Sequence, residues 1–203
     1  LGRDVDVNLF DTAMFNQSYM AAWTLNTEFK SERLDRSAHP ILVPCQLYKT
    51  KDGWIYLMCN KESFWPILCK KIGREDLSKD QRFENFACRQ ENRDEITKIL
   101  DNELMKKNTS DWLKKFGGIV PAAPILDLKE SLENPFLQDR QNIQHLKTKR
   151  GEDISLLKTP VHLSDSNFRD KTAPELGDDT HDVLEEIGFN KEQISNFKNK
   201  GII

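Results

Sequence analysis

The segment Asn60–Ser63 carries the most suggestive combination of chemical groups in this sequence. Lys61 supplies a positive charge, and the segment stands between an expected strand and an expected helix whose first N–H groups are free to donate. This combination suits a small anionic ligand. A plain helix start, capped by Ser63, explains the same residues without a ligand. The residues alone leave both interpretations open.

The four histidines are the natural candidates for proton transfer near neutral pH. His39 follows a basic segment and precedes Pro40, where a structural role is the simpler explanation. His145 and His162 fall in expected strands, and His181 falls in the acidic first turn of an expected helix. Surface or core roles fit these three, so none of the four is assigned a catalytic role from its position alone.

The sequence contains no recognisable metal site and no standard catalytic motif. The cysteines form no CxxC pair, and none stands at zinc-finger spacing from a histidine. Each lies in an apolar pattern, which predicts small buried residues in a reducing compartment. Signatures of serine hydrolases, zinc proteases and nucleotide-binding loops are missing, and Asp6 and Asp11 have no diagnostic spacing. The cysteines are Cys45, Cys59, Cys69 and Cys88.

The elements that would position Asn60–Ser63 have the clearest patterns in the chain. Residues Val43 to Thr50 and Trp54 to Cys59 are rich in β-branched and aromatic side chains and predict two strands. Asp52-Gly53 between them predicts a type I′ hairpin turn. A helix is then expected from Ser63 to Ile72, with Gly73 just beyond its end.

Further helices are expected over Asn92–Lys107, with apolar residues on one stripe, and from Thr109 or Ser110 to Phe116. Val120–Leu126 contains two prolines and predicts an extended connection. The following pairs predict two short helices and a second hairpin: Asp127 with Glu130, Asn134 with Pro135, and the strands Ile143–Thr148 and Ile154–Lys158.

The two ends of the chain have weaker patterns. Alternating residues from Val5 to Leu9 predict a strand, and Asp11 to about Glu28 predicts a helix capped by Asp11. Polar stretches at Lys30–His39 and Ser164–Pro174 predict linkers. The tail is expected to hold two short helices, of which the first ends at Gly188 and the second runs from Asn190 to Gly201.

Composition limits the classes of function. The chain has 203 residues, a formal net charge of −3 and charged residues of both signs intermixed, so a long nucleic acid is not an expected partner. No apolar run approaches the ~20 residues of a membrane-spanning helix. The first residue is Leu1, and the residues after it resemble neither a signal peptide nor a transit peptide. We therefore expect the chain to be a fragment that starts within a longer protein.

Six blocks follow one another in an order that is typical of one enzyme family. They are Gly2–Asp11; His39-Pro40 with Pro44 and Tyr48–Ile55; Phe64-Trp65 with Leu68-Cys69 and Ile72-Gly73; Asp80–Phe83 with Arg89, Asn92 and Arg93; Val120–Pro124; and Ala173–Thr180 through Leu184 and Gly188. With these blocks the chain resembles the family III CoA transferases, a group that includes formyl-CoA and carnitine-CoA transferases and an α-methylacyl-CoA racemase.

The resemblance implies an α/β protein with a small α+β domain of β-hairpins and helices. A strand and helix at the start and the C-terminal helices would belong to a Rossmann-like large domain that is otherwise missing from this chain. The implied boundaries are 1–30 for part of the large domain, 31–39 for a linker, 40–146 for the small domain, 147–172 for a hairpin and linker, and 173–203 for helices that return to the large domain. Two subunits of the full-length protein would form an interlocked homodimer.

The resemblance also implies a function. Family transferases move CoA between carboxylic acids through an aspartyl anhydride and a thioester, and their catalytic Asp lies upstream of this chain. No catalytic residue is therefore expected here, and the chain alone should be inactive. CoA thioesters and acceptor acids would be substrates, with no tightly bound cofactor and no metal. His39, Asn60, Lys61 and Glu62 are the residues expected near the substrate or CoA.

The formyl-CoA branch carries a glycine-rich loop where this chain has Leu34–Pro40 without glycine, which argues against that specialisation. Two alternatives to a transferase remain open. One is an acyl-CoA racemase or epimerase, although its supporting Glu would stand three residues before Phe64, where this chain has Lys61. The other is a non-catalytic half-subunit with a separate N-terminal partner. Either a cytoplasmic location or the mitochondrial matrix fits this chemistry, with no membrane partner expected.

Overall fold

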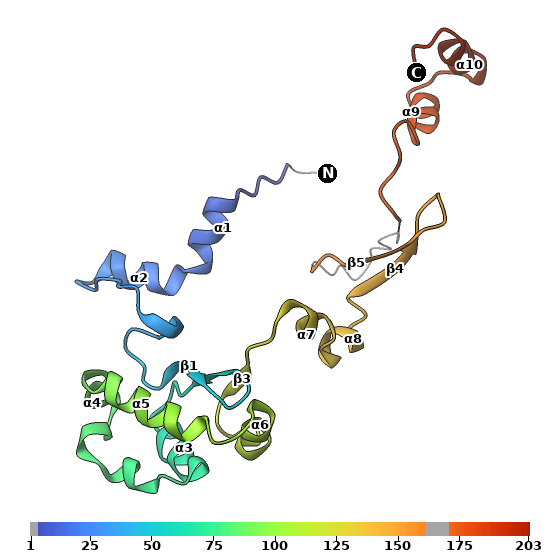
Figure 1. Cartoon of the computed structure of the whole chain (residues 1–203). Coiled ribbons are helices and arrows are strands. Elements are labelled where there is room, and N and C mark those ends of the chain that lie inside the picture. The colour runs from blue at the N-terminus through green and yellow to red at the C-terminus, as the bar shows by residue number, and fades with distance from the viewer. Residues whose placement is uncertain (1–3, 161–170) are drawn as a thin grey trace. The chain divides into compact units, whose positions relative to one another are not determined.

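The computed structural model describes residues 4–160 and 171–203 (Figure 1). Its contacts divide into two compact units with a boundary between Ile125 and Leu126. The first unit contains the helices α1 (Leu9–Asn16), α2 (Ser18–Asn26), α3 (Phe64–Ile72), α4 (Phe86–Glu91), α5 (Arg93–Leu104) and α6 (Thr109–Phe116), the 3₁₀ turns η1 (Asp35–Ser37), η2 (Glu75–Lys79) and η3 (Gln81–Phe83), and the strands β1 (Cys45–Lys49), β2 (Trp54–Met58) and β3 (Ala122–Pro124).

The sheet of the first unit has the order β1-β2-β3, and both pairs are antiparallel. Tyr48 pairs with Ile55, and Tyr56 pairs with Ala123. The first hairpin is thus confirmed. The third strand lies in the stretch expected to be extended; prolines are tolerated there because β3 is an edge strand, where part of the backbone needs no partner.

The core of the first unit forms where α3, α5 and α6 pack around this sheet (Figure 1). Amphipathic spacing brings the apolar stripes of these helices together, and Gly73 and Gly117 end α3 and α6 in the left-handed conformation, as predicted. The largest buried apolar side chains are Tyr48, Ile55, Leu57, Trp65, Leu68, Phe83, Ile96, Leu100, Leu104, Trp112 and Phe116.

The β1–β2 turn differs from the predicted type I′ turn, because neither Asp52 nor Gly53 has a positive φ. A side chain holds the turn instead. The Asp52 carboxylate accepts hydrogen bonds from the backbone N–H of Thr109 (2.8 Å), the Thr109 hydroxyl (3.0 Å) and the Thr50 hydroxyl (3.2 Å). The turn is therefore fastened to the start of α6, which local sequence could not indicate.

Replacing Asp52 by alanine should lower the melting temperature and reduce the loss of stability in acid. The Thr109 N–H, and secondarily the hydroxyls, hold the pKa of this carboxyl below its ordinary value of 3.8. Its contribution is fully present above that value and is lost as the pH falls through the lowered folded-state pKa. Thermal melts from pH 7 to 2.5 test this, with the exposed Glu84→Ala as control. Equal acid sensitivity in both variants would contradict the prediction.

The start of the chain does not follow its predicted pattern. Val5 and Val7 are 83% and 75% exposed, and residues 4–8 pair with no strand in the described parts of the chain. A strand requires a partner for its backbone groups, so the predicted strand is wrong here. The expected single helix is split into α1 and α2, and its cap is the Asn8 side chain, which accepts from the N–H of Asp11, rather than Asp11 itself.

The second unit contains α7 (Leu128–Leu132), α8 (Pro135–Asp139), β4 (Ile143–Lys147), β5 (Asp153–Leu157), α9 (Thr180–Glu186) and α10 (Lys191–Asn199). The second hairpin is confirmed, with β4 and β5 antiparallel. Capping boxes are present at Asp127–Glu130 and Asn190–Gln193. His162 and most of the predicted linker Ser164–Pro174 fall on residues 161–170, outside the described residues.

The prediction of buried, unpaired cysteines is confirmed for three of the four. All four are free thiols; Cys45, Cys59 and Cys69 are buried in the first unit, whereas Cys88 is only partly buried. Burial raises the pKa of Cys59 and of Cys69 to about 12, so these thiols stay protonated at neutral pH. Within residues 4–160 and 171–203, no helix combines the length and apolar character that crossing a membrane requires.

Candidate functional site

His39 is fixed by its own turn. Its imidazole Nδ1 accepts hydrogen bonds from the backbone N–H groups of Ile41 (3.1 Å) and Leu42 (3.0 Å), and the backbone N–H of His39 donates to the carbonyl of Cys45 (2.9 Å). Because Nδ1 is an acceptor twice, the ring must be neutral with its proton on Nε2. Burial, and secondarily the charge of Arg93, lowers the pKa of His39.

Aromatic side chains from α2 cover the imidazole. The ring of Tyr19 stacks on it with centroids 6.3 Å apart, and Trp23 meets it edge-on at 5.9 Å. These contacts give His39 a structural function in this unit. They leave Nε2–H as the ring's remaining polar donor.

Acidification should selectively loosen the His39 turn. Since the folded chain lowers the pKa of His39, its stabilising effect is present above the ordinary value of 6.5 and is lost as the pH falls below it. Asparagine can accept the same backbone N–H groups without titrating. His39→Asn should therefore lose less unfolding free energy than the unmodified chain between pH 7.5 and 5.5, as measured by urea titration. His145→Asn is the control, and an unchanged pH dependence in His39→Asn would refute this prediction.

The Asn60–Ser63 loop is exposed throughout. Ser63 does not cap α3 with its side chain, so this predicted cap is wrong; Ser63 already has helical backbone angles. Instead, the N–H groups of Phe64 and Trp65 donate to the carbonyls of Lys61 and Glu62 in a tight turn. These two donors are therefore taken, and the Lys61 ammonium is the cationic group that this loop can offer to an anion.

Glu62 has a well-defined structural partner. One oxygen of its carboxylate accepts from the guanidinium of Arg89, and the other accepts from the N–H of Phe86 at 2.7 Å. Arg89 is completely buried, whereas the Glu62 side chain is 49% exposed. The pair therefore reaches from the core to the surface loop.

Arg89 uses its other nitrogens on backbone carbonyls. Nε donates to Val43 (2.6 Å) and Nη1 donates to Phe83 (2.9 Å). The guanidinium lies 5.3 Å from the ring centroid of Trp65 and 4.7 Å from that of Phe86. Its charge is thus satisfied by a carboxylate, carbonyls and aromatic faces together, which a buried cation requires.

Arg93 holds the neighbouring segment. Its Nη2 donates to the carbonyls of His39 (2.8 Å) and Pro40 (3.0 Å). In addition, the N–H of Cys59 donates to the carbonyl of Pro44 at 3.0 Å, next to the Asn60–Ser63 loop. These contacts and those of Arg89 therefore link the His39–Val43 segment, which Pro44 follows, to the Asn60–Ser63 loop. Together the segment and the loop hold all the site residues expected from the sequence.

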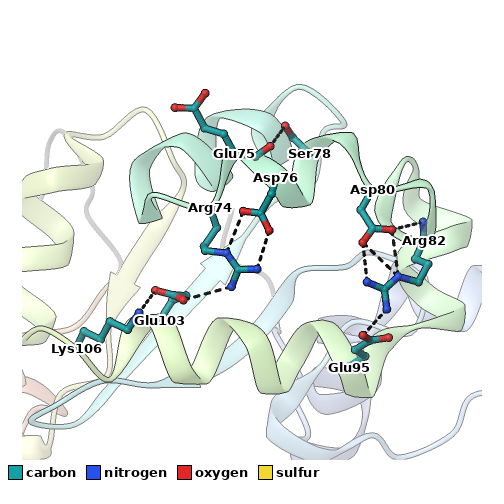
Figure 2. Close-up of polar contacts among 9 residues, drawn as sticks. All are labelled: Arg74, Glu75, Asp76, Ser78, Asp80, Arg82, Glu95, Glu103 and Lys106. Atoms are coloured by element: carbon teal, nitrogen blue, oxygen red, sulfur yellow. Dashed lines mark hydrogen bonds and ion pairs between the residues drawn. The ribbon is translucent and has the colours of Figure 1, made fainter.

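The Asp80–Phe83 block has a supporting function (Figure 2). Asp80 accepts from the backbone N–H and the guanidinium of Arg82, and Arg82 also pairs with Glu95 of α5. Figure 2 shows a parallel arrangement at Arg74, which joins Asp76 to Glu103 of the same helix. Both arginines are partly exposed, so each pair contributes little energy, and they orient η2 and η3 against α5.

Sequence reasoning missed the importance of Arg89 and Arg93 for the site. In the sequence they stand out only as parts of a family pattern. The structure places Arg89 in α4 and Arg93 at the start of α5, on either side of the helix break at Asn92. Within the described residues, no group of three or more His, Cys, Asp or Glu side chains could hold a metal ion. The arrangement can therefore present a lysine, an imidazole N–H and loop backbone to a ligand.

The fold and site define a small α+β domain in which the His39–Val43 segment is linked to the Asn60–Ser63 loop, and this loop carries the exposed lysine Lys61. The chain belongs to CoA-transferase family III, whose family model matches residues 1–180, and the predicted family is thereby confirmed. A solved CaiB/BaiF family protein from Brucella suis is 26% identical, with a TM-score of 0.71 over 92% of this chain and 48% of that protein.

Curated relatives agree with this family. An acyl-CoA transferase of Fusarium pseudograminearum is 28% identical over all of this chain and 45% of its own length. A (R)-2-hydroxy-4-methylpentanoate CoA-transferase of Clostridioides difficile is 26% identical over all of this chain and 51% of its length. The human succinyl-CoA:glutarate CoA-transferase is 28% identical over 92% of this chain and 43% of its length. The chain thus spans about half the length of the curated relatives it matches.

Proposed function

We propose that this chain is the C-terminal half of an acyl-CoA transferase that moves CoA from an acyl-CoA donor to a carboxylic acid acceptor. The observation that carries the proposal is the family match over residues 1–180, together with CoA-transferase relatives of about twice this length. In the longer protein, residues 1–30 and 173–203 would complete a Rossmann-like large domain, and residues 40–146 would form the small domain. The linkers would be 31–39 and the second part of 147–172.

The nucleophile of the reaction would be an Asp carboxylate outside this chain. It attacks the thioester carbon, the C–S bond breaks, and CoA leaves as a thiolate while an acyl–aspartyl anhydride forms. The thiolate then attacks the aspartyl carbonyl, which releases the donor acid and leaves an aspartyl–CoA thioester. The acceptor carboxylate attacks this thioester and displaces the CoA thiolate, forming a second anhydride. The thiolate finally attacks the acceptor's carbonyl, which yields the new acyl-CoA and frees the Asp carboxylate. CoA is a substrate throughout, and no resident cofactor or metal is required.

The contribution of this chain would be to cover the acyl end of the substrate. His39 offers an Nε2–H donor, while Asn60 and Lys61 lie exposed on the neighbouring loop. Glu62 would act by holding that loop through Arg89 rather than by contacting the substrate. We propose an interlocked homodimer for the longer protein, located in the cytoplasm or, alternatively, in the mitochondrial matrix.

A transferase explains the loop better than a racemase does. A racemase of this family would need a free carboxylate three residues before Phe64, where this chain has Lys61. The adjacent carboxylate of Glu62 is already bound by Arg89 and Phe86. Incubating the longer protein with a 2-methylacyl-CoA in D₂O separates the two activities, because only a racemase would exchange the α-proton.

The direct test is CoA transfer by the longer protein. We expect succinyl-CoA with glutarate or another dicarboxylate to yield the new acyl-CoA by mass spectrometry, and the 203-residue chain alone to yield none. Absence of transfer from a panel of acyl-CoA donors and acids would reject the proposal. Activity that appears only after addition of a separately encoded N-terminal chain would identify a half-subunit.

Replacing Lys61 by alanine in the longer protein should weaken use of an anionic acceptor. The loss of a charge-assisted hydrogen bond would weaken transition-state stabilisation by about 1–3 kcal/mol and lower kcat/KM for the acceptor accordingly. Thermal stability should change little, since Lys61 is exposed. Lys70→Ala, an exposed lysine at the end of α3, is the control. An unchanged kcat/KM would mean that Lys61 is only a solvated loop residue.

A further inference from the structure

Arg89 connects more parts of the candidate site than any one loop residue does. Its guanidinium contacts the carbonyl that follows the His39 turn, the carboxylate in the Asn60–Ser63 loop and the carbonyl that ends η3. We propose that Arg89 is a positioning residue that holds the His39–Val43 segment and the Asn60–Ser63 loop as one unit. Only the catalytic consequence of this inference rests on the proposed function.

The chemistry of the side chain supports this role. A planar guanidinium offers several N–H donors in fixed directions, so one arginine can hold Val43, Phe83 and Glu62 simultaneously. Trp65 and Phe86 contact its faces and restrict the plane of the fork. A lysine at this position would keep the charge, but its single ammonium lacks the fork that spans these acceptors.

The neighbouring contacts divide between the two segments. Arg93 holds only the His39–Val43 segment, through the carbonyls of His39 and Pro40. Glu62 lies in the Asn60–Ser63 loop and anchors it to Phe86 as well as to Arg89. Among these side chains, Arg89 alone contacts both segments. Loss of the Arg89 fork should therefore free both, whereas loss of either other contact should free one.

Amide hydrogen exchange of the 203-residue chain, followed by NMR, can test this division without any substrate. The reporters of the His39–Val43 segment are the N–H groups of Ile41 and Leu42, which donate to the imidazole. The reporter of the loop is the N–H of Asn60, which donates to the carbonyl of Met58. The N–H groups of Leu100 and Leu104 in the buried stripe of α5 report the overall stability.

We expect Arg89→Lys to speed exchange at least tenfold at the reporters of both segments, relative to any change in α5. Arg93→Lys should speed only Ile41 and Leu42, and Glu62→Gln should speed only Asn60. Arg82→Lys is the matched control, because Arg82 pairs with Asp80 and Glu95 away from both segments. It should leave all three reporters unchanged.

The proposal is overturned if Arg89→Lys changes only one segment, changes neither, or speeds the α5 amides by the same factor. If Arg89→Lys does not fold, Arg93→Lys and Glu62→Gln decide. Faster exchange of only Ile41 and Leu42 in the first variant and of only Asn60 in the second supports the proposal, and any other pattern overturns it. In the longer protein, Arg89→Lys should lower kcat at least tenfold with KM for acyl-CoA little changed. Loss of exchange protection without measurable transfer in any variant would reject the proposed function while leaving the positioning role intact.

Discussion

Replacing Glu62 by alanine should lower the free energy of unfolding by about 3 kcal/mol. The change leaves the charge of Arg89, which is completely buried, without its carboxylate partner. Breaking a buried ion pair from one side costs about 3–5 kcal/mol, and we take the lower end because half-exposed Glu62 leaves a route for water. The N–H of Phe86 also loses its acceptor. Urea unfolding followed by tryptophan fluorescence measures the effect.

The matched control is the preceding residue. Lys61→Ala changes the same loop but removes an exposed side chain whose ammonium contacts no other side chain in the described parts of the chain, so its effect should stay within about 0.5 kcal/mol. Glu62→Gln, which can still accept from Phe86, should fall between the two. Equal effects of Glu62→Ala and Lys61→Ala would mean that the contact with Arg89 contributes nothing to stability.

The local elements of the first unit could be predicted because their signals are short-range. The aromatic and β-branched residues of Trp54–Cys59 indicate a strand regardless of what lies elsewhere, and Gly117 ends a helix by its own backbone preference. The turn at Asp52 was different. Asp-Gly usually adopts positive φ angles, but the distant Thr109 offered donors to the carboxylate, and this long-range contact decided the conformation.

Elements that depend on partners were harder to predict. The alternation of Val5 and Val7 is typical of a strand, yet residues 4–8 pair with no strand in the described parts of the chain. Conversely, β3 was expected only to be extended because Pro121 and Pro124 disfavour a central strand; its position at the edge of the sheet removes that objection. The sequence pattern alone does not show whether residues 4–8 or β3 have a neighbouring strand to pair with.

The sequence indicated the loop Asn60–Ser63 of the candidate site, but the contacts that hold this loop come from Arg89 in α4. The segment Asn60–Ser63 stood out because Lys61 supplies a charge between an expected strand and an expected helix start, a pattern that is visible in the sequence. Arg89 lies between polar residues in Cys88–Asn92, where nothing signals burial. Its role depends on carbonyl groups of Val43 and Phe83, and backbone acceptors leave no trace in the amino-acid sequence.

Replacing Phe83 by alanine should destabilise the first unit by about 3–5 kcal/mol. The ring is fully buried and meets Trp65 edge-on at 6.2 Å, so the substitution leaves a cavity that the surrounding helices cannot fill. The carbonyl of Phe83 also accepts from Arg89, so collapse of the cavity would disturb that contact. Urea unfolding measures the change, and a loss below about 1 kcal/mol would contradict the packing described for this ring.

Phe10→Ala is the matched substitution, and we expect it to affect the stability of the 203-residue chain and of the proposed longer protein differently. Phe10 lies in α1 and is 73% exposed, so its removal from the 203-residue chain should change the free energy of unfolding by less than about 0.5 kcal/mol. If α1 completes a large domain, the same ring would be buried there, and Phe10→Ala should destabilise the longer protein by about 2–4 kcal/mol. An unchanged free energy of unfolding in both proteins would argue against the proposed large domain, because the Phe10 ring would then not be buried by the rest of that domain.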